Sequence, residues 1–267
     1  MKKLPVIIVS LFASCTIAPR ISVSNESVGS NSVGIDGKIF ATAYTQKAAE
    51  YRALCFQAYN IARLRVEQIV NKNYSKPKAL ITDIDETVLD NSAYEAHQTL
   101  QGKDYEPASW AEWTAMANAD TVPGALSFLK FASSKGIEIF YVTNRAEKER
   151  EVTLKNLKKF NFPNADNAHL LLRENNSSKE ERRKSIAVSY SIVMFLGDNL
   201  ADFNFLFDVK NSGERLNSVN ATAGEFGDKF IILPNFAYGD WESSLYNYRP
   251  LTQAQKDSSI KAALNSY

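Results

Sequence analysis

Five short runs of apolar, β-favouring residues recur along the chain and are separated by longer segments with helical spacing. The runs cover residues 79–81, 137–142, 168–172, 192–196 and 230–233. Strands that alternate with helices in this way form βαβ units, in which helices cover both faces of a parallel sheet. The sequence therefore predicts an α/β fold with a Rossmann-like parallel sheet. Sheets of this type bind ligands beyond the carboxyl ends of their strands.

Polar residues follow four of the five runs. Asp83 and Asp85 come directly after the first run, Thr143 after the second, Lys179 just past the third, and Asp198 after the fourth. On a strand, residues two apart point the same way, so the two acids of the first pair should emerge together. Like charges this close require a cation, or a proton on one of them. The sequence therefore predicts one polar site at the carboxyl edge of the sheet.

The first acidic pair has two less specific explanations. One is a surface turn, because turns that hold two acids are common. The other is a calcium loop with Asp83, Asp85 and Thr87 as ligands, which needs glycine at its sixth position and glutamate at its twelfth. Val88 and Tyr94 occupy these positions, so the calcium loop is excluded.

Other ways of handling phosphate esters are poorly represented in the chain. A cysteine phosphatase loop has an arginine six residues after its cysteine, and neither Cys15 nor Cys55 has one. The two histidines, His97 and His169, lack the context of a histidine phosphatase and are interpreted as structural or surface residues. The sequence also has no G-x-x-x-x-G-K-[ST] phosphate loop. The strand-end carboxylates remain as candidate catalytic groups.

The strand-end residues suit the hydrolysis of a phosphate ester through a covalent intermediate. A carboxylate that approaches a phosphate dianion is repelled, so the reaction needs a bridging cation, and Mg²⁺ is the candidate cofactor. Asp83, Asp85 and Asp198 are the candidate metal ligands, because Mg²⁺ prefers oxygen ligands. Asp83 would attack phosphorus to form an aspartyl-phosphate. Asp85 would protonate the leaving group and later activate water.

Three further residues are expected to support this chemistry. Thr143 and Lys179 would hold the phosphoryl oxygens, and Lys179 would offset negative charge in the transition state. Asp202, one helical turn beyond Asp198, would orient the residues around the metal. We expect an acidic pH optimum, because Asp85 must carry a proton at the first step.

Two longer stretches carry a resemblance to a known family. Residues 81–94 (ITDIDETVLDNSAY) and 193–203 (VMFLGDNLADF) resemble the paired signatures of the class C nonspecific acid phosphatases, which belong to the haloacid dehalogenase (HAD) superfamily. Thr82 is a departure, since a small apolar residue is usual there. The resemblance extends from about Tyr44 to the C-terminus. It implies a HAD-like parallel sheet with a small, mainly helical cap.

The same resemblance implies a substrate class. The family includes 5′-nucleotidases that hold a base between two aromatic rings, and Trp110 and Tyr238 match those positions. Stacking tolerates different bases, which suits a broad nucleotidase. The alternative is that both rings only pack the cap. Asn144, next to Thr143, is counted with the phosphate-binding residues.

The N-terminus has the pattern of an export signal. Lys2 and Lys3 precede a short apolar run at residues 4–13, and small residues lead to Cys15. Residues 1–15 resemble a bacterial lipoprotein signal, in which Cys15 is lipidated, and the run is too short to span a bilayer. The chain is therefore expected to be an outer-membrane or cell-surface lipoprotein, with a periplasmic or secreted protein as the alternative.

The rest of the chain is expected to form one phosphatase domain. Residues 16–40 are rich in Ser, Asn and Gly and predict a flexible tether. The domain then covers residues 41–267, with a long helix at 44–70 and the cap segment at 91–122. The helix and the cap offer surfaces for a homodimer. With 31 basic and 30 acidic side chains, no excess of positive charge indicates binding to a nucleic-acid polymer.

We therefore predict an exported, Mg²⁺-dependent acid phosphatase. Its expected substrates are phosphomonoesters, chiefly nucleoside 5′-monophosphates, and its expected intermediate is an aspartyl-phosphate. One alternative is a phosphotransferase that passes the same phosphoryl group to an alcohol. Another is a surface lipoprotein that binds nucleotides without turnover.

Overall fold

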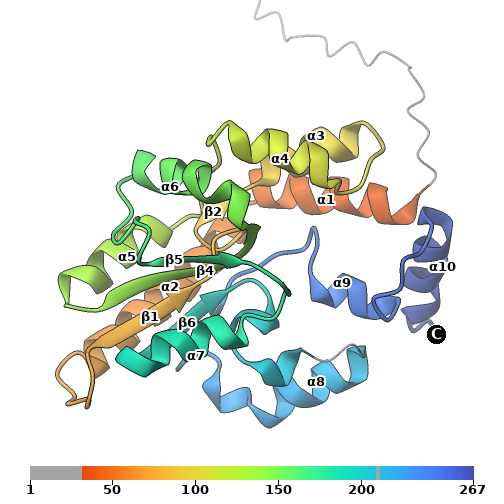
Figure 1. The fold of residues 1–267 in the computed structure, drawn as a ribbon. Coiled ribbons are helices and arrows are strands. Elements are labelled where there is room, and N and C mark those ends of the chain that lie inside the picture. The colour runs from red at the N-terminus through yellow and green to blue at the C-terminus, as the bar shows by residue number, and fades with distance from the viewer. Residues whose placement is uncertain (1–31, 209–210) are drawn as a thin grey trace, which may run out of the picture.

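A parallel sheet of five strands forms the centre of the computed structural model, which describes residues 32–208 and 211–267 (Figure 1). The strand order is β5-β4-β1-β6-β7, and every neighbouring pair is parallel. The predicted α/β sheet flanked by helices is confirmed. The strands are β1 (Lys78–Thr82), β4 (Glu138–Ala146), β5 (Leu170–Arg173), β6 (Ser191–Gly197) and β7 (Phe230–Ile232).

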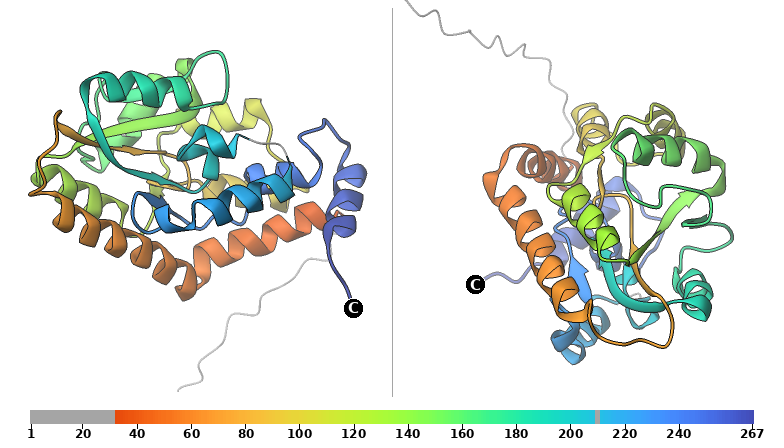
Figure 2. Two further views of the ribbon diagram at one scale, coloured as in Figure 1. Left: turned by 90° about the horizontal axis from the view of Figure 1, so that it is seen from below. Right: turned by 90° about the vertical axis from the view of Figure 1, so that its left-hand side faces the viewer.

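Side chains of β1 alternate between the two faces of the sheet. Leu80 packs in the apolar cluster of one face, whereas Ala79 and Ile81 pack in the cluster of the other. Because both faces are covered, the middle of the strand, residues 79–81, is an uninterrupted apolar run. Figure 2 shows helices on both sides of the sheet. One face is covered by α2 (Ala49–Ile69), α5 (Ala125–Ser134) and α6 (Arg150–Lys159), the other by α7 (Glu180–Ser189) and α8 (Ser212–Ala221).

Strand β4 continues beyond its expected end at residue 142. Ala146 still pairs with Arg173 of β5, after an irregularity in the register, so the segment between stays extended. Alternate residues of a strand point to one side. Thr143 and Arg145 are accordingly buried, whereas Asn144 between them is exposed.

Two helices precede the sheet where one was expected at residues 44–70. The first, α1, spans Val33–Lys47, and α2 follows after Ala48, whose backbone is extended (φ −76°, ψ 128°). The prediction of a single helix is wrong, because the two halves pack on different partners. Helix α1 lies against α3 and α10, and α2 lies against α5 and β7 (Figure 2).

The start of α1 falls inside the tether that was expected at residues 16–40. Ser32 caps the helix, and Asp257 accepts hydrogen bonds from the amides of Val33 and Gly34 at 3.2 and 3.0 Å. These contacts satisfy first-turn amides that would otherwise lack partners. The tether prediction is therefore wrong for residues 33–40, because composition does not reveal a partner far along the chain. The predicted signal and Cys15 lie outside the described residues.

The segment predicted as a cap, residues 91–122, contains a small helical layer. Its helices are α3 (Ser92–Leu100) and α4 (Pro107–Ala115). The chain enters and leaves this layer through the short antiparallel strands β2 (Leu89–Asp90) and β3 (Asp120–Thr121). Figure 1 shows α3 and α4 above α1.

The C-terminal helices return to the start of the described chain. Helix α10 (Gln253–Ala263) packs against α1 and against α9 (Asp240–Leu245). No helix in residues 32–208 or 211–267 is both long and apolar enough to cross a membrane. The remaining short helices are η1 (Glu147–Glu149), η2 (Leu200–Asp202), η3 (Phe205–Phe207) and η4 (Ala223–Glu225).

Candidate active site

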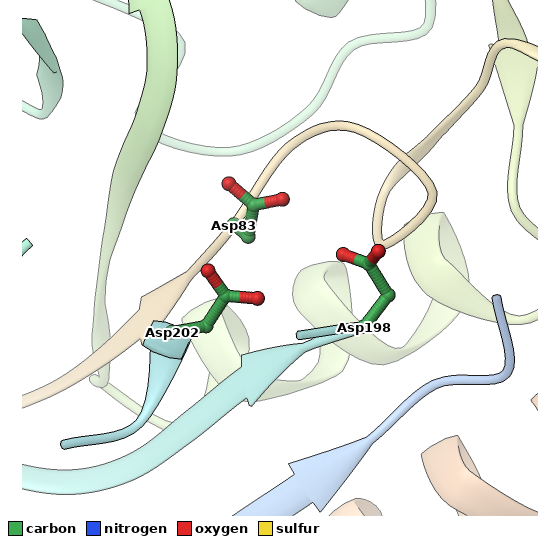
Figure 3. A group of neighbouring side chains, drawn as sticks. All are labelled: Asp83, Asp198 and Asp202. Carbon is green, nitrogen blue, oxygen red and sulfur yellow. The ribbon is translucent and has the colours of Figure 1, made fainter. Parts of the chain in front are cut away.

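Three aspartates converge at the carboxyl ends of two neighbouring strands. Asp83 follows β1, Asp198 follows β6, and Asp202 ends the short helix η2. The Asp83 amide donates to the Leu196 carbonyl at 2.9 Å, which ties the two strand ends together. One carboxylate oxygen from each aspartate lies within 4.8 Å of those from the other two (Figure 3). Residues far apart in the chain thus form one acidic group.

Lys179 joins this group from the beginning of α7. Its side chain is 4% exposed, and its ammonium contacts the carboxylate of Asp83 and lies 2.7 Å from that of Asp202. Burial alone would lower the pKa of Lys179, but the carboxylates of Asp202 and Asp83 outweigh burial and raise it. The site therefore holds a lysine that stays positively charged.

Asp202 is held firmly between the lysine and the backbone. Besides its contact with Lys179, it accepts a hydrogen bond from the Asn199 amide at 3.0 Å. A Cβ atom at Gly197 would overlap the Asp202 side chain, so β6 has to end in glycine for Asp202 to approach. This arrangement suits the orienting role predicted for Asp202.

Asp198 is bound by two neutral side chains. Its two carboxylate oxygens accept hydrogen bonds from the Thr87 hydroxyl at 3.1 Å and from the Asn235 amide at 2.8 Å. Burial and the nearby Asp202 raise the pKa of Asp198 to about 7, although Asn235 and Lys179 oppose the rise. The carboxylate is thus positioned while its charge is poorly compensated.

The acidic group suits a hard divalent cation. Burial raises the pKa of Asp83; Lys179 opposes this rise and Asp202 adds to it, so the site is short of positive charge. Carboxylate oxygens are the ligands that Mg²⁺ and Ca²⁺ prefer, and a bound cation would favour the ionised form of each acid. Asp83 and Asp198 are the first candidates to hold it, because Asp202 already binds Lys179 and the Asn199 amide.

Asp85 lines the same cavity as Asp83, but its carboxylate has other partners than the predicted metal. Strand β1 ends at Thr82, and the chain then turns through Glu86 (φ 55°), so the alternation of a strand no longer applies. The Asp85 carboxylate is bound by the Arg145 guanidinium and the Asn91 amide. Its side chain is outside the three-aspartate group. The prediction that this side chain is a metal ligand is corrected accordingly.

The residues predicted to bind phosphate lie along the end of β4 and at α7. Thr143, Asn144 and Lys179 line one cavity with Asp83. Arg182, one turn after Lys179 on α7, donates to the Thr143 carbonyl at 2.5 Å and to the Asn144 side chain at 2.8 Å. Arg182 therefore holds this segment of β4 against α7.

The cavity extends from the acidic group to the cap and the C-terminal segment. Its volume is about 720 Å³, and both Trp110 and Tyr238 line it together with Asp83. Trp110 packs edge-on against Tyr94, with ring centroids 5.1 Å apart. The structure thus brings both predicted aromatic residues to the cavity that contains the acids.

Sequence reasoning assigned no role to several residues that contact the site. Arg145 could have been found from its spacing, since it lies two residues after Thr143 on what proves to be the same strand. Arg182 lies one helical turn after Lys179. The contacts of Asn91 and Asn235 with Asp85 and Asp198 depend on the tertiary fold, and no local pattern indicates them.

Comparison with known proteins agrees with this geometry. Residues 27–241 match the family model described as HAD superfamily, subfamily IIIB (acid phosphatase). A curated relative, acid phosphatase 1 of Solanum lycopersicum, is 27% identical over 130 residues, which cover 46% of this chain and 50% of the relative. The chain thus matches about half the length of that relative.

Two solved structures resemble almost the whole described fold. The class C acid phosphatase from Bacillus anthracis is 38% identical, with a TM-score of 0.85, and the match covers 88% of this chain and 99% of that one. A second structure of that enzyme, with tungstate bound, is 39% identical, also with a TM-score of 0.85, and the match covers 87% and 98% of the two chains. The expected resemblance and the expected class, a phosphoric monoester hydrolase, are confirmed. This chain belongs to the acid phosphatase family, subfamily IIIB of the HAD superfamily.

Proposed function

We propose that this protein is a Mg²⁺-dependent acid phosphatase that hydrolyses nucleoside 5′-monophosphates and other small phosphomonoesters through an aspartyl-phosphate. The convergence of Asp83, Asp198 and Lys179 at adjacent strand ends carries the proposal. Mg²⁺, when bound by Asp83 and Asp198, would neutralise the charge of the phosphate and orient it.

In the first half of the reaction, a carboxylate oxygen of Asp83 attacks phosphorus. The bond between phosphorus and the ester oxygen breaks, and a proton passes from Asp85 to the departing oxygen. Lys179 stays cationic next to Asp83 and stabilises negative charge on the transferring phosphoryl group. Thr143 supports the same group from the end of β4.

In the second half, water replaces the leaving group. Asp85 now accepts a proton from this water, whose oxygen attacks phosphorus, and the bond between phosphorus and Asp83 breaks. Inorganic phosphate is released and both carboxyl groups return to their first state. Carboxyl groups hold a proton mainly in acidic solution, and activity should therefore rise towards acidic pH.

The aromatic part of the cavity supports the proposed nucleotide preference. A volume of about 720 Å³ lies within the range of small-molecule sites. Trp110 and Tyr238 line it on different segments of the chain, and stacking of a base on such rings is tolerant of base identity. We therefore place the nucleoside between the acids and these rings.

The test is a phosphate-release assay on purified protein, with AMP, 4-nitrophenyl phosphate and a sugar phosphate as substrates. We expect turnover with Mg²⁺, loss with EDTA, and faster hydrolysis of AMP than of the sugar phosphate. Asp83→Asn should abolish turnover, whereas the exposed Asp36→Asn is the matched control. An alcohol added as acceptor would reveal a phosphotransferase through a new phosphate ester. Full activity of Asp83→Asn would end the proposal.

The proposed location is the outer membrane or the cell surface, through a lipid on Cys15. The charged start, apolar run and terminal cysteine of residues 1–15 support it. Metabolic labelling with a radioactive fatty acid should mark the wild-type chain when it is expressed in a bacterium, and leave Cys15→Ser unlabelled. Label retained by Cys15→Ser would contradict the anchor.

A further inference from the structure

The carboxylate of Asp85 is held by two side chains from different parts of the fold. From β4, the Nε of Arg145 lies 3.1 Å from both carboxylate oxygens, and Nη2 lies 2.7 Å from Oδ1. From the start of the cap, the side-chain amide of Asn91 donates to Oδ1 at 2.9 Å. The guanidinium fixes the plane of a carboxylate as well as its position. Asp85 is therefore oriented rather than free to rotate.

Arg145 is itself fixed by the residues around it. Its side chain is 2% exposed, and Nη1 donates to the Thr153 hydroxyl at 3.2 Å. The face of Trp110 lies 5.7 Å from the guanidinium carbon, within the range of a cation–π contact. All three guanidinium nitrogens thus have partners within the protein. This geometry fits a residue that holds Asp85 better than one that waits to bind a substrate phosphate.

Asn91 is fixed in a corresponding way. It is fully buried, its side-chain oxygen accepts a hydrogen bond from the Trp113 indole at 2.8 Å, and its backbone N–H donates to the Glu86 carboxylate at 2.9 Å. The only orientation of the Asn91 side chain that satisfies both Trp113 and Asp85 is the observed one. The tryptophan thereby selects which end of the Asn91 amide faces the acid.

Both contacts lead to the same cap helix. Trp110 and Trp113 lie three residues apart on α4, and residues with this spacing share a helix face. Trp110 covers Arg145, and Trp113 binds Asn91. Asp85 is thus connected to α4 through two separate side chains, although it belongs to the loop after β1.

We propose that Arg145 and Asn91 are positioning residues that, together with α4, aim the Asp85 carboxyl group at the ester oxygen of the substrate. This inference rests on the proposed role of Asp85 as the proton donor. The cap then does more than enclose the substrate, because it determines the direction in which the proton is delivered.

Proton delivery has a kinetic signature that phosphate binding lacks. When the bond between phosphorus and oxygen breaks, 4-nitrophenolate leaves without a proton, whereas an unsubstituted phenolate or an alkoxide needs one. A misaligned proton donor should therefore slow the hydrolysis of esters with poor leaving groups and have little effect on 4-nitrophenyl phosphate. General acid catalysis contributes about 10²–10⁴-fold, which sets the largest difference expected between the two substrates.

The experiment compares kcat/KM for 4-nitrophenyl phosphate and phenyl phosphate, whose rings have similar shapes. This parameter reports steps up to formation of the aspartyl-phosphate, so later hydrolysis does not affect it. We expect Arg145→Ala and Asn91→Ala to reduce kcat/KM for phenyl phosphate at least about tenfold more than for 4-nitrophenyl phosphate, within the contribution of a general acid. Arg145→Lys should give a difference between that of Arg145→Ala and that of the wild type, since lysine keeps the charge but lacks the planar set of donors of the guanidinium.

Two measurements separate positioning from damage to the fold. Inhibition by inorganic phosphate should be unchanged in the variants, because the phosphate site is intact. Trp113→Phe keeps an aromatic ring, loses only the donor to Asn91, and should show a smaller difference of the same sign. The matched control is Arg150→Ala, which removes a partly exposed arginine that pairs with Glu147.

Asp85→Ala distinguishes the inference from the function on which it rests. Suppose that Asp85→Ala lowers kcat/KM more for phenyl phosphate than for 4-nitrophenyl phosphate, whereas the Arg145 and Asn91 variants lower both values equally. The positioning role is then wrong, and Asp85 remains the proton donor. If Asp85→Ala also lowers kcat/KM equally for the two substrates, Asp85 is not the proton donor, and the positioning role is wrong as well. Weaker phosphate inhibition in Arg145→Lys would show that Arg145 binds the phosphoryl group, which also overturns the inference.

Discussion

Two clusters of buried and partly buried charges line the same cavity, and they differ in how well their charges are balanced. The strand-end cluster consists of Asp83, Asp198, Asp202 and Lys179, and it has three carboxylates for one ammonium. The interhelical cluster lies where α1, α3, α9 and α10 meet. It consists of Lys38, Glu95, Asp104, Glu242 and Lys256.

The interhelical cluster is close to neutral. Lys38 lies 2.6 Å from Asp104 and 3.3 Å from Glu242, and Lys256 lies 2.8 Å from Asp104. Burial would raise the pKa of Asp104, but the two lysines outweigh it and lower the pKa to about 2. Glu95 is the one surplus acid. Burial raises its pKa to about 7, against the effect of Lys38.

The two clusters differ in how completely their charges are paired. In the interhelical cluster each lysine has an acidic partner: Lys38 of α1 and Lys256 of α10 both pair with Asp104 in the loop after α3, and Lys38 also pairs with Glu242 of α9, so the ion pairs hold these elements together. In the strand-end cluster three acids face a single lysine, and a divalent cation would neutralise the remaining negative charge. Buried charge alone marks neither role, whereas an uncompensated excess of one sign indicates a ligand.

The strongest test of this contrast is Asp83→Asn. It should lower kcat/KM by about 10⁴-fold or more, as expected for removal of a nucleophile. It also removes one of several repelling charges, so the free energy of unfolding without metal should be unchanged or higher. Phosphate release and urea denaturation measure the two effects. A marked loss of stability would mean that the strand-end cluster is structural.

Removal of the metal should have the next largest effect. EDTA should abolish turnover and Mg²⁺ should restore it, and Mg²⁺ should raise the melting temperature by binding only the folded state. Asp198→Asn should increase the Mg²⁺ concentration needed for half-maximal activity on the order of 10–100-fold or more, because even residues that only support a metal ligand contribute this much. The exposed Asp36→Asn is the control. Equal metal dependence in both variants would remove Asp198 from the metal site.

Lys38→Met tests the interhelical cluster. It leaves Asp104 and Glu242 buried with less compensation, which should lower the free energy of unfolding by about 3 kcal/mol, the range found when one partner of a buried ion pair is removed. Urea denaturation measures the loss. Lys47→Met, which changes an exposed lysine on the same helix, should alter the free energy of unfolding by only about a few tenths of a kcal/mol. Similar values for the two variants would show that the cluster does not join the helices.

The last effect expected is a pH dependence from Glu95. Its pKa rises from 4.5 to about 7 on folding, so the folded protein holds a proton that the unfolded chain releases in this window. Stability should therefore decrease as the pH rises from about 4.5 to 7. Glu95→Gln removes this pH dependence. The free energy of unfolding of the variant, relative to that of the wild type, should therefore increase by up to about 3 kcal/mol between pH 5 and 8, at 1.36 kcal/mol per pKa unit.

Glu112→Gln, an exposed glutamate on α4, is the control for that measurement. Unfolding free energies of Glu95→Gln, Glu112→Gln and the wild type should be compared at pH 5 and pH 8. If the difference between Glu95→Gln and the wild type does not depend on pH, Glu95 is not the surplus acid of the cluster.

Several features of the site were predictable because they follow from local sequence. An apolar run that ends in Asp83, and another that ends in Gly197 and Asp198, specify buried strands with acids at their carboxyl ends. Parallel pairing then brings such ends to one edge of the sheet, whatever lies between them in the chain. The same logic placed Thr143 and Lys179 at this edge.

Other features could not be predicted, because they depend on contacts between distant segments. Asp85 looked like a metal ligand beside Asp83 by spacing, but its carboxylate, although it lines the same cavity, is bound by Arg145 and Asn91. The helical start of α1 looked like part of a tether, because its partner Asp257 lies more than two hundred residues away.

The sequence by itself determined that this chain forms a parallel α/β sheet with acids at its strand ends, because hydrophobic periodicity is a local property of the chain. Only the tertiary structure decided how the charges are shared. Which acid binds a lysine, which one binds an arginine and which are left for a cation depend on distances of a few ångströms between elements. Electrostatic energies inside proteins change steeply over such distances, and no spacing along the chain encodes them.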